Sequence, residues 1–230
     1  MIEKPFSPVY TNKLSETFPD LKQYILQNYP QAHFYKKGDE IPHVSEKVIL
    51  YIKKGSIKSY ICDETGEERL MYIFLEDSIV FCHFHSYFIK RLLVNEPAEI
   101  YYAPQTSITK FVQKKVEYID LWTSIVSSRY GILLQTILSV NHCSSKHKVY
   151  SFIYQLALKY GKKNGQQYTI KSCPSLTDVA SITGVHRSNA TTYINELQSQ
   201  DILKKEKNTL VIYDLDLLKS IIDSLDSCKN

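Results

Sequence analysis

The sequence predicts an α+β chain with an N-terminal antiparallel β-roll, a long central helix, and a C-terminal domain of helices with a β-hairpin. Two observations favour two domains over one: 230 residues exceed most single domains, and the composition changes along the chain. Residues 34–111 are dense in Ile, Val, Tyr and Phe, whereas residues 114–140 lack proline and follow a helical pattern. We therefore expect a roll over residues 1–112, a long helix and hinge over 113–147, and a last domain over 148–230.

Composition and charge exclude several classes of protein. With 43% hydrophobic and 23% charged residues, the chain is neither disordered nor a fibrous repeat. The formal net charge of +4 is compatible with a polyanionic partner without indicating one. The five cysteines are widely spaced without a C-x-x-C pair, which argues against a disulfide framework and a zinc motif. Because the sequence has no apolar signal core and no segment of roughly 18 uncharged apolar residues, we expect a cytoplasmic protein without a membrane partner.

The first half of the chain predicts a short helix or two, followed by strands. Residues 14–28 carry Leu21, Tyr24 and Ile25 at helical spacing. The stretch "KVILYIKKGSIKSYICDETGEERLMYIFLEDSIVF" is strand-like, is broken by Gly55 and contains the turn signal "DETGEE". Short strands about ten residues apart are typical of an all-β roll or barrel.

The proline-free segment predicts a long helix with one apolar seam. Its seam positions recur at spacings of 4, 3, 4 and 3, as in a coiled coil: Val126, Tyr130, Leu133, Ile137 and Val140. About 25 helical residues at about 1.5 Å each span roughly 40 Å, long enough to pair with a second copy of the chain. The alternative is a long helix that lies on the core of its own domain.

The last third begins with another amphipathic helix. The segment "HKVYSFIYQLALKYG" places five apolar residues on one stripe and ends at Gly161: Val149, Phe152, Ile153, Leu156 and Ala157. We expect the next segment, "KKNGQQYTIKSCP", to be a polar loop.

Residues 174–214 have the spacing of a helix-turn-helix. Ser175 followed by Asp178 is a capping-box-like helix start. Gly184 allows the left-handed backbone of a tight interhelical turn, and the small Ala180 lets the next helix approach closely.

The second of these helices, from about Arg187 to Gln198, separates an apolar side from a polar side. Ala190, Ile194 and Leu197 are expected to be buried at spacings of 4 and 3, which turns Ser188, Thr192 and Asn195 outward, with Arg187 and Thr191 along the edge. Arginine suits guanine O6 and N7, hydroxyls suit either base type, and a threonine methyl can meet a thymine methyl.

The following "DILKKEKNTLVIYD" predicts a β-hairpin with a basic tip, whose Lys204, Lys205 and Lys207 are placed to contact phosphate. Each lysine taken alone is also explained as a solvated surface charge. The DNA contacts that we predict are His186, Arg187, Ser188, Asn189, Thr191, Thr192, Ser175, Lys205 and Lys207.

Three stretches together resemble the Crp/Fnr family of bacterial transcription regulators: the roll segment with Gly55 and the acidic turn at 63–67, the long helix, and "LTDVASITGVHRSNATTYINELQSQDIL". The resemblance implies a cyclic-nucleotide-binding-like jelly roll, a dimerisation helix and a winged helix-turn-helix. It further implies a regulator, not an enzyme, whose partners are double-stranded promoter DNA with a palindromic site, a second copy of the chain, RNA polymerase and an effector.

Matched by position, the base-contacting residues of the family fall on Arg187, Ser188 and Thr192. Many members carry Glu at the second position and Arg at the third. We therefore expect an operator that departs from the commonest half-site.

Two ligands known in the family, a cyclic nucleotide and an iron-sulfur cluster, do not fit this sequence. Members that bind cyclic nucleotides have a Gly-Glu turn and an Arg followed by Ser or Thr, which together hold a phosphate. Here "SIVFCHFH" contains no glycine, and Arg91 is followed by Leu92. Iron-sulfur members use an N-terminal cysteine cluster, and residues 1–33 contain no cysteine.

The stretch "DSIVFCHFHSYF" contains the candidate metal ligands Cys82, His83 and His85. It resembles the haem-based carbon monoxide sensors of the family loosely, which leaves a haem-based gas sensor as an alternative. The other interpretation makes Cys82 a small buried hydrophobe and places the histidines in a pocket or at a bend. We expect no cofactor.

The better match is to the branch that responds to halogenated aromatic compounds, through "GEERLMYIFLEDSIVF" and "VNEPAEIYYA". A phenolic acid requires an aromatic-rich apolar pocket with a cation or hydroxyl donors. Taken one residue at a time, core packing is the favoured explanation for most of the candidate aromatics. The predicted effector-binding residues are Tyr72, Phe74, Phe81, His83, Phe84, Tyr87, Arg129 and Tyr130.

Two further alternatives remain open. The chain could bind DNA constitutively, with a vestigial sensor domain. It could also be a cupin-like metalloenzyme, in which His83 and His85 would need a third ligand such as His33 or His43.

Overall fold

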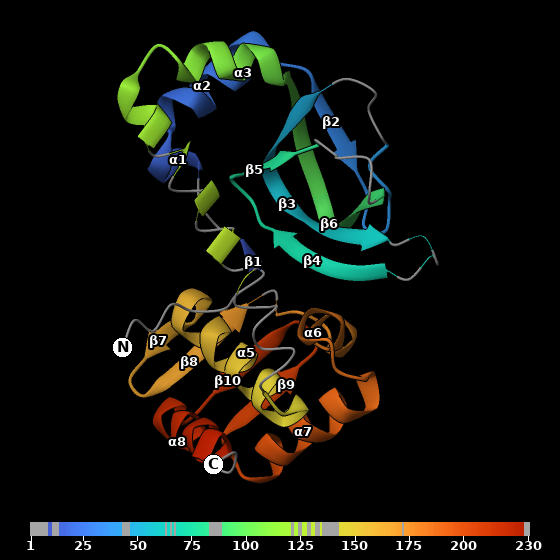
Figure 1. The fold of residues 1–230 in the computed structure, drawn as a ribbon, viewed down its shortest axis with the longest axis vertical. Helices are drawn as coiled ribbons and strands as arrows, with labels where there is room; N and C mark the ends of the chain where they lie inside the picture. The colour runs from blue at the N-terminus through green and yellow to red at the C-terminus, as the bar shows by residue number, and fades with distance from the viewer. Residues whose placement is uncertain are drawn as a thin grey trace. The chain divides into compact units, whose positions relative to one another are not determined.

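The structure is a computed structural model that describes residues 9–10, 14–42, 47–62, 64, 66, 68–82, 89–120, 122–123, 126–127, 130–131, 134, 143–171 and 173–227 (Figure 1). The chain forms two units, Pro8–Arg129 and Met1–Ser7 with Tyr130–Asn230. None of the helices in this described part combines the length and the apolar character needed to cross a lipid bilayer.

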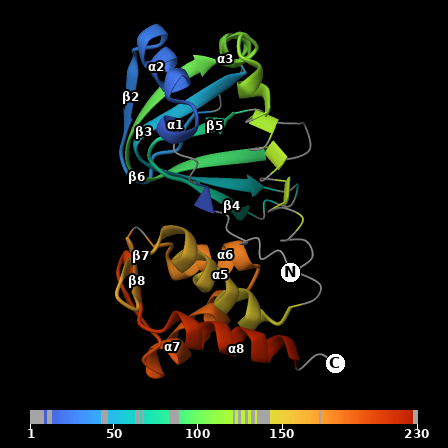
Figure 2. The same cartoon turned by 90° about the vertical axis from the view of Figure 1, so that its left-hand side faces the viewer.

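The first unit is built on a six-stranded sheet (Figure 2). The strand order is β1-β4-β3-β6-β2, and β5 also pairs with β3. All of these pairs are antiparallel except β1 with β4. The strands are β1 (Val9–Tyr10), β2 (Ala32–Tyr35), β3 (Val48–Cys62), β4 (Glu68–Phe74), β5 (Ser78–Phe81) and β6 (Ile89–Pro104).

Two strands of this sheet are longer than the short strands that the sequence predicts. β3 has 15 residues and β6 has 16, and they pair along most of their length. Gly55 does not end β3. The strand continues through it and bends there, where the register of its pairing with β6 shifts several times. The φ of Gly55 is +86°, and a Cβ there would lie 2.3 Å from the carbonyl oxygen of Pro97. The sequence predicted a break between strands at Gly55, whereas the structure has one curved strand at this position.

Helices α1 (Leu14–Thr17), α2 (Pro19–Asn28) and α3 (Gln105–Val112) pack on this sheet. The first two confirm the predicted helices over residues 14–28, whereas α3 is helical at the end of the stretch 34–111 in which the sequence predicted strands. Asp77 joins α1 to the sheet: it accepts hydrogen bonds from the Ser15 hydroxyl and N–H and from Tyr51 Oη at 2.8 Å. Lys22 Nζ lies 3.2 Å from the same carboxylate. Burial raises the pKa of Asp77, but the hydrogen bonds outweigh it and hold the pKa below its usual value.

The predicted long helix is described only in part. Residues 116–120 are helical, and Tyr118 and Trp122 pack edge-on against Phe18, at ring-centroid distances of 5.3 and 6.1 Å. One side of this segment therefore lies on the core of the roll. Other large apolar side chains are exposed, two of them from the predicted seam: Val116, Ile119, Val126, Tyr130 and Leu134. Three seam positions, Leu133, Ile137 and Val140, lie outside the described residues.

The second unit packs helices on a four-stranded antiparallel sheet of order β7-β8-β10-β9. Its predicted buried stripe on α5 is confirmed, since all five residues are buried. The elements are α5 (Ser145–Tyr160), β7 (Lys162–Asn164), β8 (Gln167–Lys171), α6 (Leu176–Thr183), α7 (Arg187–Ser199), β9 (Leu203–Glu206), β10 (Thr209–Ile212) and α8 (Leu215–Ser227).

The prediction of a polar loop after α5 was wrong. This segment forms the β7–β8 hairpin, and β8 pairs with β10. Gly165, at φ +61°, turns the hairpin directly after Asn164. Asn-Gly is a strong hairpin signal, and the polar residues around it obscured the signal. Only Ile170 of β8 is fully buried, so the strand shows little hydrophobic alternation.

Candidate nucleic-acid interface

The start of α6 is fixed by a complete capping box, as the sequence predicts. Ser175 Oγ accepts the N–H of Asp178 at 3.2 Å, and the Asp178 carboxylate accepts the N–H of Ser175 at 3.0 Å. Ser175 Oγ also donates to that carboxylate at 2.7 Å. The hydroxyl is engaged in the cap, and Ser175 remains exposed at the beginning of the helix.

A tight turn joins α6 to α7. Gly184 adopts the left-handed conformation at φ 64°, as predicted, and the N–H of Val185 donates to the carbonyl of Ala180 at 3.0 Å. Val185 is buried after the turn, and Thr183 Oγ1 donates back to the carbonyl of Val179 at 2.7 Å. These contacts fix the direction in which α7 leaves the turn.

Helix α7 has the two sides that its sequence predicts. Ala190, Ile194 and Leu197 are at most 1% exposed, which places one side in the core. The opposite side is open to solvent, and Thr191 at its edge is half-buried. The exposed residues on α7 and at its N-cap are His186, Arg187, Ser188, Asn189, Thr192, Asn195 and, at the C-terminal end, Ser199.

Local hydrogen bonds decide what this side offers a partner. Thr192 Oγ1 donates its proton to the carbonyl of Ser188 at 3.0 Å, and Thr191 Oγ1 donates to the carbonyl of Arg187 at 2.9 Å. Both threonines therefore keep an acceptor oxygen and a methyl group for other contacts. His186 Nδ1 lies 2.8 Å from Ser188 Oγ, so these two side chains are coupled at the start of the helix.

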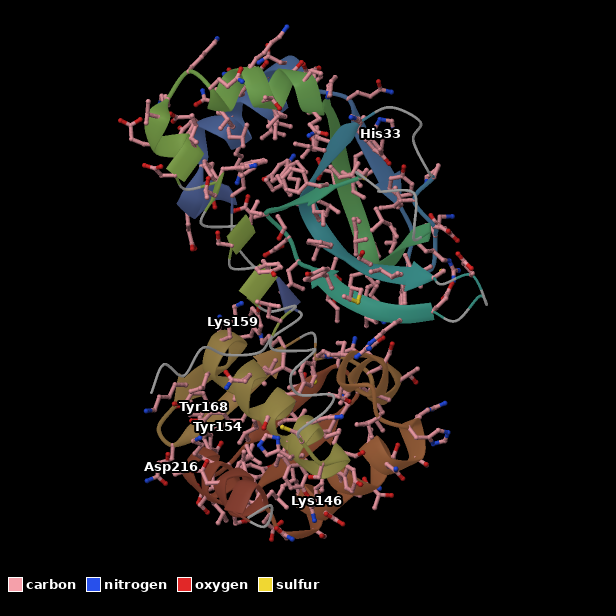
Figure 3. The ribbon with its side chains drawn as sticks, in the orientation of Figure 1. His33, Lys146, Tyr154, Lys159, Tyr168 and Asp216 are labelled. Carbon is pink, nitrogen blue, oxygen red and sulfur yellow. The ribbon has the colours of Figure 1, made fainter. Side chains whose placement is uncertain are left out.

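A polar cluster holds α7 against α5. Glu196 accepts from Tyr150 Oη at 2.9 Å and pairs with Lys146 at 2.6 Å. Lys146 lies near the beginning of α5 (Figure 3). The Lys146 ammonium, with help from Tyr150, lowers the pKa of Glu196. Burial, together with the Glu196 carboxylate, raises the pKa of Tyr150. Neither Tyr150 nor Glu196 was expected to carry this role.

The β9–β10 hairpin lies where the sequence predicts it, with Lys207 exposed at its tip. The three lysines differ in their surroundings. Lys204 Nζ pairs with Glu206 at 2.6 Å. Lys205 Nζ donates to the carbonyls of Pro174, at 3.0 Å, and Lys207, at 3.4 Å, so it ties the hairpin to the chain just before α6.

The structure describes four of the eight predicted effector-binding residues. Tyr72 and Phe74 lie together, with ring centroids 5.8 Å apart, and Phe74 is part of the core. Phe81 packs against Trp122 at 5.0 Å. Tyr130 belongs to the other unit and is exposed. The remaining four candidates lie outside the described residues: His83, Phe84, Tyr87 and Arg129.

The metal hypotheses fall largely on residues that the structure does not describe. Cys82 is half-buried against the core, whereas His83, His85 and His43 lie outside the described residues. His33 packs edge-on against Tyr102 at 4.7 Å. Within the described ranges, no three His, Cys, Asp or Glu side chains come together in a way that would hold a metal ion.

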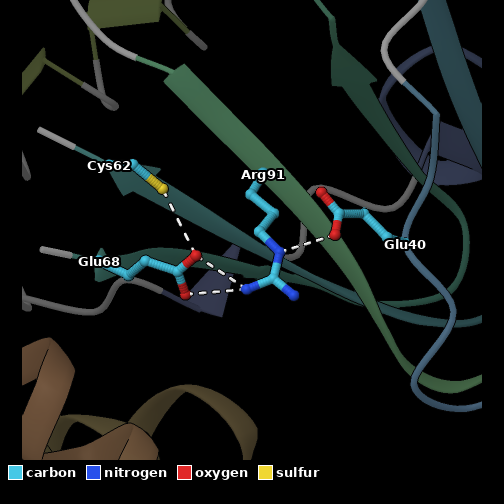
Figure 4. A network of polar contacts seen from close by, with 4 residues as sticks. All are labelled: Glu40, Cys62, Glu68 and Arg91. Carbon is cyan, nitrogen blue, oxygen red and sulfur yellow. Dashed lines mark hydrogen bonds and ion pairs between the residues drawn. The ribbon is translucent and has the colours of Figure 1, made fainter. Parts of the chain in front are cut away.

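Arg91 is engaged by two carboxylates on the sheet (Figure 4). Its Nε donates to Glu40 at 2.8 Å, and its Nη1 donates to both oxygens of Glu68, at 2.8 and 3.0 Å. The hydrogen bonds to Glu40 and then Glu68 raise the pKa of the guanidinium. An anionic ligand at Arg91 would have to displace these carboxylates.

No family model matches the chain, and no curated protein matches its sequence. Solved structures match over most of its length. OCPA-complexed CprK, a variant with a cysteine replaced by serine, is 20% identical over 93% of this chain and 96% of its own, with a TM-score of 0.73. A mutant of CooA from Carboxydothermus hydrogenoformans is 18% identical over 92% of this chain and 96% of its own, with a TM-score of 0.75. FixK2 from Bradyrhizobium japonicum is 14% identical over 85% of this chain and 96% of its own, with a TM-score of 0.67.

This chain has the fold of the Crp/Fnr regulators. CprK, CooA and FixK2 all belong to that family, so the resemblance in the sequence and the likeness in structure agree. At identities of 14–20% the likeness establishes the fold alone. What each of these proteins binds is a property of that protein.

Within the Crp/Fnr fold, sequence reasoning missed one residue beside the predicted DNA contacts. Gln198 Oε1 accepts the backbone N–H of Lys205 at 3.0 Å, which connects α7 directly to the hairpin. The signal was weak, because a glutamine near the end of a helix is ordinary. Only the position of the hairpin, which depends on the tertiary fold, gives this glutamine its partner.

Proposed function

We propose that this chain is an effector-responsive, sequence-specific DNA-binding transcription regulator and not an enzyme. The observation that carries the proposal is the exposed polar side of α7 opposite its buried side. In this proposal α6 and α7 form a helix-turn-helix, α7 enters the major groove, and the β9–β10 hairpin is the wing. With 13 residues, α7 is about 20 Å long, enough to lie along one groove.

The chemistry of α7 favours base contacts at its beginning. Arg187 is exposed and offers the bidentate donor pair that suits guanine O6 and N7. Thr192 presents a methyl group and an acceptor oxygen, because its proton is used within the helix. This combination suits a thymine methyl or the amino group of adenine or cytosine. Lys207, which is exposed, is the proposed phosphate contact. Ser175 is also exposed, but its hydroxyl and its N–H both donate to Asp178, so it would have to release this carboxylate to bind a phosphate.

The active form in this proposal is a homodimer. Val116, Ile119, Val126, Tyr130 and Leu134 are exposed in the single chain, and large exposed apolar groups favour association. Helix-turn-helix dimers bind half-sites about one turn of DNA apart, roughly 34 Å, so a palindromic promoter site follows from the symmetry. RNA polymerase is the proposed further partner, at promoters in the cytoplasm.

The proposed effector is a small aromatic molecule bound by the roll. The aromatic residues around Tyr72, Phe74 and Phe81 support this choice, as does the likeness to CprK, which was solved with OCPA. The engagement of Arg91 argues against a cyclic phosphate at that position. Binding would shift the population between two dimer arrangements, and a difference in affinity of about 1 to 3 kcal/mol is sufficient for regulation.

The test measures binding of the purified full chain to duplexes selected from a random pool. Arg187→Ala is expected to weaken binding to the selected site by about 1 to 3 kcal/mol and to relax the choice of one base pair in each half-site. Arg69→Ala is the matched control, because Arg69 is an exposed arginine on β4 of the roll. If the wild-type chain selects no sequence, the proposal is wrong.

A further inference from the structure

A chain of hydrogen bonds runs from the β9–β10 hairpin to the exposed side of α7. The backbone N–H of Lys205 donates to Gln198 Oε1 at 3.0 Å, and Gln198 Nε2 donates to Asn195 Oδ1, also at 3.0 Å. Asn195 and Gln198 are three residues apart, the spacing at which side chains on a helix meet. Asn195 is exposed and Gln198 is half-buried. The hairpin backbone is thus connected to a group that faces solvent.

The direction of these bonds follows from the chemistry of each group. A backbone N–H can only donate, so Gln198 must turn its oxygen to Lys205. Its other amide atom, Nε2, can only donate, so Asn195 must turn its oxygen to Gln198. Rotating the Gln198 amide by half a turn would place two donors face to face at Lys205 and two acceptors face to face at Asn195. Rotating the Asn195 amide would place two donors face to face at Gln198. The Nδ2 group of Asn195, with its two hydrogens, is therefore the part left for a partner.

We infer that Asn195 is a further DNA-contacting residue, which presents an N–H donor to an acceptor atom on the duplex, and that Gln198 is the positioning residue that fixes this polarity. The inference rests on the proposed function of α7. Asn195 is exposed on α7 three residues beyond Thr192, so it extends the same face by one turn. The acceptor is either a phosphate oxygen or a base atom such as guanine N7 or thymine O4.

Gln198→Glu tests the polarity directly. A carboxylate can still accept the Lys205 N–H with one oxygen, but it cannot donate to Asn195. Asn195 is then expected to turn its Nδ2 toward the new carboxylate and its Oδ1 outward, which converts the exposed donor into an acceptor. Gln200→Glu is the matched control, because Gln200 is exposed at the end of α7 and gains the same charge without facing Asn195.

A double-mutant cycle separates polarity from charge. Asn195→Ala is expected to weaken binding to the selected duplex about 3- to 10-fold, the effect of one lost hydrogen bond. Gln198→Glu is expected to weaken binding more than Gln200→Glu does. In the Asn195→Ala background, Gln198→Glu and Gln200→Glu are expected to have equal effects, because only the charge remains to act.

Two results overturn the inference: Asn195→Ala binding as tightly as the wild type, or Gln198→Glu behaving like Gln200→Glu when Asn195 is present. Because Asn195 is exposed, its variants test the contact even where Gln198→Glu loosens the hairpin. A wild-type chain that binds no DNA would instead defeat the proposed function, which is a different outcome.

The dependence of binding on DNA sequence identifies the acceptor. If Asn195 contacts a base, Asn195→Ala relaxes the preference at one base pair per half-site, and Gln198→Glu changes that preference toward a base that donates. If it contacts phosphate, Asn195→Ala weakens all duplexes alike. Both results support the donor role, and they assign it to different parts of the DNA.

Discussion

The α6–α7 pair and the β-roll differ in how directly their sequences reveal a functional surface. On α7 the buried and exposed residues alternate with the helix period, so each side chain has one evident environment. On β3 the four residues Ile49–Ile52 are all at most 1% exposed, because both faces of the sheet are covered. The alternation of apolar and polar residues that marks a strand with one exposed face is therefore absent from this part of the sequence. Where one side of an element faces solvent, its polar residues can be recognised as candidates; where both sides are buried, pocket and core look alike.

The largest expected effect sharpens this contrast on the roll. Gly55→Ala should lower the free energy of unfolding of the roll by about 3 to 5 kcal/mol, from left-handed strain together with a clash against the Pro97 carbonyl. Gly66→Ala is the matched control, since Gly66 also has a positive φ but no atom within 4 Å of the added Cβ. Fluorescence of Trp122, the single tryptophan, reports unfolding of the roll. Equal effects of the two substitutions would contradict the proposed close approach at Gly55.

A comparable substitution in α7 tests the other region. Ile194→Ala should destabilise the second unit by about 2 to 4 kcal/mol, because it removes a buried side chain and leaves a cavity. Thr192→Ala, on the exposed side, should change stability by less than about 0.5 kcal/mol. Helical circular dichroism during denaturation measures both. A larger loss for Thr192→Ala would mean that the two sides of α7 have been exchanged.

Substitution of two of the three hairpin lysines should separate effects on stability from effects on DNA affinity. Lys207→Ala is expected to weaken binding to all duplexes by about 1 kcal/mol and to reduce the salt dependence by about one phosphate contact. Lys205→Ala should also loosen the hairpin, since its ammonium holds the carbonyls of Pro174 and Lys207. Hydrogen exchange of the β9 amides distinguishes the two variants, because only Lys205→Ala should accelerate it. Identical exchange rates in both variants would argue that the Lys205 hydrogen bonds do not stabilise the hairpin.

The smallest expected effect is a pH dependence confined to the roll. Asp77 has a folded-state pKa below its ordinary value of 3.8, so its carboxylate stabilises the fold at neutral pH. That contribution begins to be lost as the pH falls to about 4, the ordinary pKa of the group, and is fully lost once the pH is below the lowered folded-state pKa. Asp77→Asn should therefore be less stable at pH 7 and lose less stability on acidification. Trp122 fluorescence at pH 7 and pH 3 measures the difference, and parallel losses in both proteins would exclude Asp77 as the cause.

The same contrast explains what the sequence could and could not predict. The capping box, the Gly184 turn and the two sides of α7 depend on residues a few positions apart, and all three were predicted correctly. The β7–β8 hairpin is also local, but its polar residues obscured the Asn-Gly turn, and its pairing with β10 involves a strand that comes later in the chain. The Gln198 contact likewise depends on where β9 lies. In the roll, Tyr72 and Phe74 were proposed as pocket residues, yet Phe74 packs in the core. Whether the other aromatics bind an effector stays a prediction.

The pairing of β1 with β4 has a practical consequence. Val9 and Tyr10 lie parallel to Ile73 and Phe74 at the margin of the six-stranded sheet. Uncovered strand margins recruit other strands and promote aggregation. Deleting the first ten residues, a routine step toward better crystals, would remove β1, expose the edge of β4 and favour insoluble protein. Expression tags are therefore better attached at the other end.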